Sequence, residues 1–171
     1  NYIRQNDPNT AANNAAIQKA IQSGTGLLSY FGHSSATSFD FNLNDPEALS
    51  YTKGRLPVFL ANGCKAAEFF DLNTMRYNQA QLSLSERFVF AKNKGSIAFI
   101  SSTHYGILQY LDFFTEKWYA AIATTHYSKS IGEIHQEAIK KMLEKTTLND
   151  PAARLTAEEY HLHGDPVIRM H

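Results

Sequence analysis

Three short apolar segments, each followed directly by small and polar residues, constrain the fold of this chain most strongly. They cover residues 27–31, 56–61 and 96–101, and helix-forming segments precede and separate them. Short apolar strands that alternate with helices are typical of a mostly parallel sheet with helices on both faces. We therefore predict one α/β domain over residues 1–171, because no linker or internal repeat divides the sequence.

Helix start signals lie beside these strands. Ser83 with Glu86 and Ser130 with Glu133 have the spacing of capping boxes, in which two residues satisfy each other's backbone N–H groups. Both pairs precede segments whose apolar residues recur on one helical face. We expect helical segments at residues 10–23, 44–49, 83–94, 107–123, 131–145 and 156–160, with residues 161–169 as a tail.

Each predicted strand ends in a short polar segment, which we call its tip. The tips are residues 32–35 (GHSS), 62–65 (NGCK) and 102–105 (STHY). Loops at the carboxyl ends of parallel strands converge at one edge of the sheet, where ligands and reacting groups gather. The sequence therefore predicts that His33 and Cys64 lie at the same edge.

A thiol beside an imidazole has the chemistry of a nucleophile with its general base. The imidazole takes the thiol proton and later protonates the leaving group. The glycines before these residues, Gly32 and Gly63, permit sharp turns and close approach of a substrate backbone. The alternative is that Cys64 is an inert buried residue, and by residue chemistry alone this alternative is favoured.

Composition excludes several classes of function. Lysine and arginine total 16, as do aspartate and glutamate, so the chain has no basic field that would attract nucleic acid. No apolar run approaches the roughly 18 residues of a membrane span. The one cysteine excludes internal disulfides and zinc sites with several Cys ligands. We expect no metal or organic cofactor, although His161 and His163 beside Asp165 leave metal ligation as an alternative.

Four blocks of sequence resemble the gingipain family of bacterial cysteine peptidases. They are residues 28–35, residues 56–64 with Phe69 downstream, residues 83–88 leading into 95–103, and residues 163–169. Their order and approximate spacing are similar to those of the family. The resemblance implies a caspase-like three-layer sandwich whose first strands precede Asn1. It also implies that this upstream half of the domain is a partner of the present chain.

The resemblance also implies a function. It makes His33 the catalytic histidine and Cys64 the nucleophile of an endopeptidase that cleaves protein or peptide substrates through an acyl-enzyme. It further implies an extracytoplasmic location: secreted, on the cell surface or periplasmic. Two alternatives stay open, which are a catalytically degenerate module for binding or assembly and a sortase-type transpeptidase in protein secretion.

Further site residues are expected around this pair. The resemblance implies an oxyanion-binding N–H at Ser34, where the family usually has glycine, and a serine supplies it only if the turn avoids a glycine-only conformation. Ser102, Thr103 and His104 are expected to line the substrate cleft, with a plain loop as the alternative. The predicted oxyanion- and substrate-binding residues are Gly32, Ser34, Gly63, Ser102, Thr103 and His104.

Overall fold

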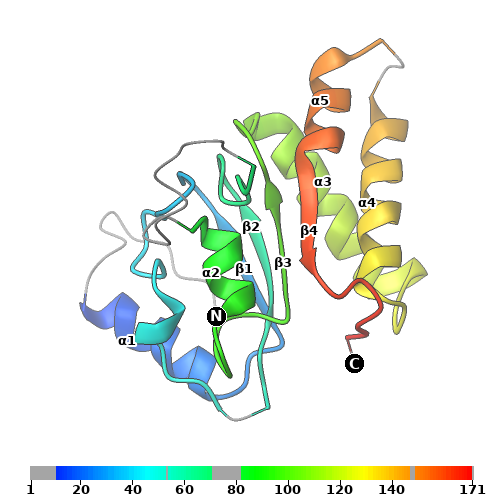
Figure 1. The fold of residues 1–171 in the computed structure, drawn as a ribbon. Helices are drawn as coiled ribbons and strands as arrows, with labels where there is room; N and C mark the ends of the chain where they lie inside the picture. Colours follow the sequence, from blue (N-terminus) through cyan, green and yellow to red (C-terminus); the bar gives the residue numbers. More distant parts are fainter. Residues whose placement is uncertain (1–10, 53, 71–81, 147–148, 171) are drawn as a thin grey trace.

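The computed structural model describes residues 11–52, 54–70, 82–146 and 149–170 (Figure 1). In chain order the elements are α1 (Ala11–Gln22), β1 (Leu27–Phe31), the 3-10 turn η1 (Pro46–Ala48), β2 (Val58–Asn62), α2 (Leu84–Phe90), β3 (Ala98–Ser102), α3 (Leu108–Ala120), the π-helical turn η3 (Ala121–Thr125), α4 (Ile131–Lys145), α5 (Pro151–Glu159) and β4 (Tyr160–Gly164).

The four described strands form one sheet in the order β1-β2-β3-β4. The first three strands are parallel, with Leu27 opposite Val58 and Val58 opposite Ala98. The fourth strand runs antiparallel to β3 and places Gly164 opposite Ala98. The predicted mostly parallel sheet is thus confirmed, whereas β4 falls in a segment for which the sequence predicted no strand.

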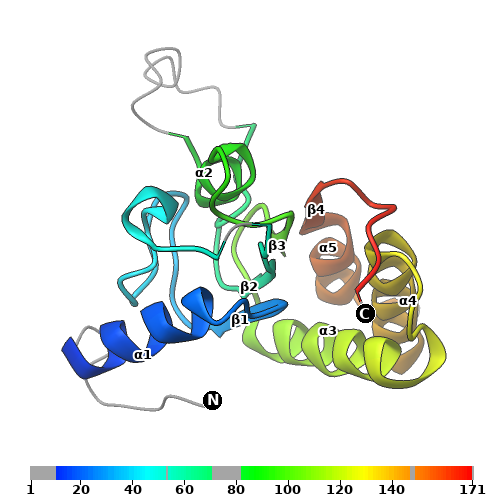
Figure 2. The ribbon, with the colours of Figure 1, turned by 90° about the horizontal axis from the view of Figure 1, so that it is seen from below.

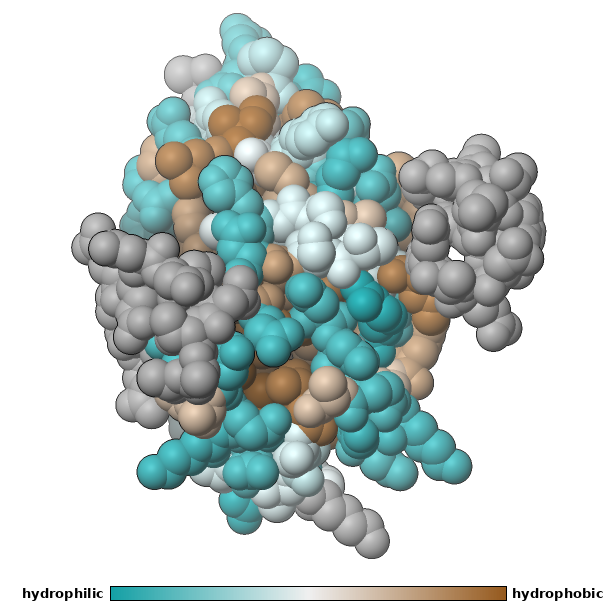
Figure 3. All heavy atoms as spheres, turned by 90° about the vertical axis from the view of Figure 1, so that its left-hand side faces the viewer, coloured by the Kyte–Doolittle hydropathy of each residue, from teal (hydrophilic) through white to brown (hydrophobic). Residues whose placement is uncertain are grey.

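Helices cover both faces of the sheet, so the fold has three layers. The strands lie between α2 on one side and α3 on the other (Figure 2). On the α2 side the rings of Phe59 and Phe99 pack 4.9 Å apart, centroid to centroid, and Phe88 of α2 packs 5.1 Å from Phe59. The surface over α1 and its neighbours is mostly hydrophilic, with apolar residues in small areas between polar ones (Figure 3).

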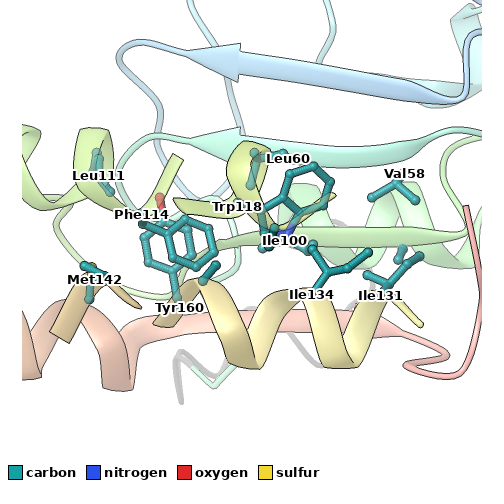
Figure 4. Close-up of a cluster of buried hydrophobic side chains, with 13 residues drawn as sticks. Val58, Leu60, Ile100, Leu111, Phe114, Trp118, Ile131, Ile134, Met142 and Tyr160 are labelled. Carbon is teal, nitrogen blue, oxygen red and sulfur yellow. The ribbon is translucent and has the colours of Figure 1, made fainter. Parts of the chain in front are cut away.

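The larger core cluster lies between the sheet and helices α3 and α4. Figure 4 shows Trp118 and Phe114 of α3 between the strands and α4, and both side chains are fully buried. The ring of Phe114 stacks on Tyr160, the first residue of β4, at 3.9 Å. Buried side chains of Ile131 and Ile134 bring α4 onto the same cluster. Burial of apolar side chains on this scale is what holds the helical layer to the sheet.

Both predicted capping boxes are formed. Ser83 and Ser130 each accept a hydrogen bond from the backbone N–H of the glutamate three residues later, and each glutamate caps the serine N–H in return. Helix α4 has the predicted bounds, whereas α2 already ends at Phe90. Local hydrogen bonding therefore sets the start of both helices.

The C-terminal helix begins earlier than predicted. We expected it at residues 156–160, but α5 starts at Pro151 because Asp150 accepts hydrogen bonds from the backbone N–H groups of Ala152 and Ala153 at 3.1 Å each. Proline at the first helical position after an aspartate cap is a strong start signal. Tyr160 belongs to β4 rather than to the helix.

No helix within the described ranges combines the length and the apolar character needed to cross a lipid bilayer.

The buried histidine of α4 makes stability depend on pH. His135 packs its ring 5.6 Å from that of Phe114, and its Nδ1 has no hydrogen-bond partner among the described residues. Burial lowers the pKa of His135 from 6.5 to about 4, although a hydrogen bond with the backbone of Tyr160 acts in the opposite direction. The folded state therefore favours the neutral ring.

We predict that stability falls as the pH drops from about 6.5 to about 4. The unfolded chain takes up the His135 proton first, and a pKa difference of this size corresponds to about 3 kcal/mol of unfolding free energy. Urea unfolding at several pH values measures the slope. His135→Gln should flatten the slope, whereas His126→Gln, at a partly exposed histidine, should not. Equal slopes for wild type and His135→Gln would contradict this assignment.

Candidate active site

The tips of β1 and β2 lie side by side. Their strands are parallel with Phe31 opposite Asn62, and the Gly32 N–H donates to the Asn62 carbonyl oxygen at 3.1 Å. This bond continues the ladder by one residue beyond the strands. It brings Gly32 beside Gly63, so that His33 and Cys64 follow at neighbouring points on the same edge.

The tip of β3 joins them on the other side of β2. The backbone N–H of Lys65 donates to the His104 carbonyl oxygen at 2.8 Å, and that of Ala67 donates to the Ser102 carbonyl oxygen at 3.1 Å. The three tips therefore meet at the carboxyl edge of the sheet, as parallel strands lead one to expect.

His33 is anchored through its backbone and exposes its ring. Its carbonyl oxygen accepts a hydrogen bond from the hydroxyl of Tyr30, which is buried with its ring 4.6 Å from that of Phe39. Burial raises the pKa of Tyr30 to about 12, so the hydroxyl keeps its proton and stays a donor. The backbone is thereby held while the imidazole faces solvent.

Cys64 is partly exposed, which differs from the environment of an inert core cysteine. Its sulfur accepts a hydrogen bond from the Gly106 N–H at 3.3 Å. The next residue, Lys65, has a φ of 61°, a left-handed conformation that is uncommon outside glycine. The chain thus turns sharply just after the thiol.

The side chains of His33 and Cys64 share no hydrogen bond in the described part of the chain. Catalytic hydrogen bonds are often long before substrate binds, and they tighten in the substrate complex. What the structure brings together is the pair of loops that carry these two residues.

Ser34 links these two loops directly. Its hydroxyl donates to the Cys64 carbonyl oxygen at 2.7 Å. Among the described non-glycine residues, positive φ occurs at Lys65, Asn93 and Ser128, and so not at Ser34. The turn therefore avoids a glycine-only conformation. This meets the requirement for a serine at this position to offer its backbone N–H.

Gly63 is fixed by the same contact. A Cβ atom there would lie 2.2 Å from the Ser34 Oγ and 2.9 Å from the Gly32 carbonyl oxygen. Both distances are far below van der Waals contact, so any side chain would push the loops apart. The residue before the thiol must remain glycine for the two tips to stay this close.

The β3 tip presents one of its predicted residues to solvent and buries the other two. Ser102 and Thr103 are buried, and their hydroxyls donate to the Glu159 carboxylate at 3.4 Å and the Glu159 carbonyl at 3.1 Å, respectively. His104 is exposed, with its ring 4.8 Å from that of Tyr105. The two hydroxyls hold the loop from within, and His104 is the residue that faces outward.

Sequence reasoning missed two groups near this edge. Glu159 is a buried carboxyl behind the β3 tip, and burial raises its pKa, although the charge of His104 and the hydrogen bond from Ser102 act to lower it. Its position depends on the pairing of β3 with β4. Gly106 contacts the thiol, and its only sequence signal was a glycine directly after the third tip.

The histidines that raised the alternative of metal ligation pack against an aromatic ring. The ring centroids of His161 and His163 lie 6.5 Å apart, and the Phe69 ring lies 5.7 Å from the first and 4.7 Å from the second. Burial lowers the pKa of His163. Within the described ranges, no group of three or more His, Cys, Asp or Glu side chains is placed to hold a metal ion.

Comparison with known proteins identifies the family. The sequence matches the profile of peptidase family C25 over residues 1–171. The chain belongs to peptidase family C25. This confirms the predicted relationship to the gingipain cysteine peptidases. Among curated proteins, none matches the chain.

Two solved structures show the same fold. One is the crystal structure of the Arg-specific cysteine proteinase gingipain R (RgpB), with a TM-score of 0.75 and 19% identity over 91% of this chain and 35% of that one. The other is the complex of Porphyromonas gingivalis RgpB pro- and mature domains, with a TM-score of 0.74 and 18% identity over 90% of this chain and 36% of that one. They confirm the predicted caspase-like sandwich, and this family C25 chain spans about a third of their length.

We predict that Ser34 and Gly63 are energetically coupled. Gly63→Ala should destabilise the protein strongly, because its Cβ collides with the Ser34 Oγ. The double variant Ser34→Gly/Gly63→Ala should regain part of that loss, with a coupling of about 1 kcal/mol or more. Urea unfolding of the two single variants and the double variant measures it. Strictly additive effects would contradict the loop contact.

Proposed function

We propose that this family C25 chain carries the catalytic half of a cysteine endopeptidase, with His33 as general base and Cys64 as nucleophile. The observation that supports this most is the link between their loops, the 2.7 Å hydrogen bond from the Ser34 hydroxyl to the Cys64 carbonyl. The partial exposure of Cys64 and the exposed ring of His33 support it further.

The reaction begins with proton transfer. His33 takes the proton from the Cys64 sulfur, and the thiolate attacks the carbonyl carbon of the scissile peptide bond. When the carbon–nitrogen bond breaks, His33 returns the proton to the leaving amine, and the acyl group remains on sulfur as a thioester. His33 then takes a proton from water as the water oxygen attacks the thioester carbon. When the carbon–sulfur bond breaks, the acid product leaves and His33 returns the proton to the Cys64 sulfur.

The tetrahedral oxyanion needs a donor close to both residues. We assign this role to the backbone N–H of Ser34, whose φ lies outside the left-handed region. Loss of one oxyanion donor typically slows catalysis by about 10²–10³-fold. Gly32 and Gly63 let the two tips pack closely at the same edge, because a Cβ atom at either position would collide with the Tyr30 hydroxyl or the Ser34 Oγ, and His104 borders this edge.

The rest of the same protein is the proposed partner of this chain. β1 is an edge of the described sheet, and its last residue, Phe31, is 44% exposed. The outer backbone N–H and C=O groups of an edge strand form a contact surface for further sheet. We also propose an extracytoplasmic location, which rests on the family relationship.

Peptide cleavage by the complete protein tests the dyad. Cys64→Ala and His33→Ala should each lower kcat/KM by about 10³-fold or more, because each removes a group that acts on the reacting atoms. His126→Ala is the matched control, since it removes a partly exposed histidine at the end of η3, and it should leave cleavage unchanged.

Two results would overturn this assignment. If a peptidyl electrophile fails to label Cys64, and Cys64→Ala cleaves peptides as wild type does, the chain is a peptidase-like binding module. If labelling occurs but added amines increase turnover of the acyl-enzyme and capture its acyl group, the protein is a transpeptidase rather than a hydrolase.

A further inference from the structure

A backbone group from a third loop reaches the sulfur of Cys64. The N–H of Gly106, which lies between the β3 tip and α3, donates to the Cys64 Sγ at 3.3 Å. The carbonyl oxygen of Gly106 lies 4.0 Å from the same sulfur. Both backbone polar groups of Gly106 therefore lie near the Cys64 sulfur, the atom that the proposed function makes the nucleophile.

The packing around residue 106 explains why this position is occupied by glycine. A Cβ atom at this position would lie 2.6 Å from a terminal methyl carbon of Leu111, which is buried in the core cluster under α3. Because Gly106 has no side chain, its backbone packs directly against Leu111. This close approach brings its N–H within reach of the thiol.

The loop that carries Gly106 is also held from the other side. The His104 carbonyl accepts from the Lys65 N–H at 2.8 Å, and the His104 N–H donates to the Ser102 Oγ at 3.2 Å. Thr103 is tied to Glu159 through its own N–H at 2.9 Å. The donor is therefore fixed in place before any substrate arrives, as an electrostatic catalytic group requires.

We propose that the Gly106 N–H is a catalytic group that stabilises the thiolate of Cys64, an inference that rests on the proposed function. A thiolate accepts hydrogen bonds and donates none, so deprotonation strengthens the bond from Gly106 while any bond to the Gly106 carbonyl is lost. A donor that binds the charged form more tightly than the neutral form shifts the balance towards thiolate.

The same bond acts at both ends of the reaction. When His33 takes the thiol proton, negative charge on sulfur is met by the Gly106 N–H. As sulfur bonds to the scissile carbonyl carbon, the charge moves to the carbonyl oxygen and the bond from Gly106 weakens. When the second tetrahedral intermediate collapses, the carbon–sulfur bond breaks, the charge returns to sulfur, and the bond to Gly106 forms again.

An amide-to-ester exchange tests this role. Replacing Gly106 by glycolic acid in the complete protein removes the N–H and adds no side chain. The pH at which alkylation of Cys64 by iodoacetamide reaches half its maximal rate should rise by about one unit. The kcat/KM of peptide cleavage should fall about tenfold. The matched control replaces Ile107 by its hydroxy acid, which weakens the Gly106 carbonyl as an acceptor but keeps the Gly106 N–H, and its midpoint should not rise above that of wild type.

A spectroscopic measurement on the wild-type protein is independent of any variant. With ¹⁵N-glycine labelling, the Gly106 amide proton signal should move with pH at the same midpoint as iodoacetamide alkylation, and Cys64→Ala should abolish the movement. A Gly106 signal that does not follow the alkylation midpoint, or a folded glycolate variant with an unchanged midpoint, overturns the proposal. If the midpoint shifts but wild type cleaves no peptide, the donor role stands and the proposed function falls.

Discussion

The parallel pairing of β1 with β2 is the constraint on which the candidate site depends. Its register sets Phe31 opposite Asn62, and one further hydrogen bond from Gly32 carries the ladder into the tips. A shift of one residue would turn each side chain to the other face of the sheet. Phe59 and Tyr30 would then leave the core cluster on the α2 side, so core packing and site geometry fix the same register.

Close contact between loops sets the chemistry of the tips. Gly63 and Gly106 each leave space that a neighbouring side chain fills, Ser34 in one case and Leu111 in the other. These contacts bring a hydroxyl to the Cys64 carbonyl and a backbone N–H to its sulfur. The donors around the thiol therefore come from backbone packing, with few charged side chains involved.

The sequence predicts those features that depend on local signals. The predicted bounds are correct for the strand at 27–31 and the helix at 131–145, and both predicted capping boxes are formed. Apolar runs and serine–glutamate spacing can be recognised within a short stretch of sequence. β4 was not predicted, since half-buried His161 and His163 interrupt its apolar pattern. The burial of Glu159 and the contact of Gly106 with sulfur depend on tertiary pairing, which no local pattern encodes.

The most direct test of the account is a crystal structure of the complete protein labelled by a peptidyl chloromethyl ketone. We predict a bond from the inhibitor's methylene carbon to the Cys64 sulfur, with a ring nitrogen of His33 within about 4 Å of that sulfur. The Ser34 hydroxyl should remain on the Cys64 carbonyl. An inhibitor bonded to another residue, or a His33 ring turned away from the sulfur beyond about 7 Å, would contradict it.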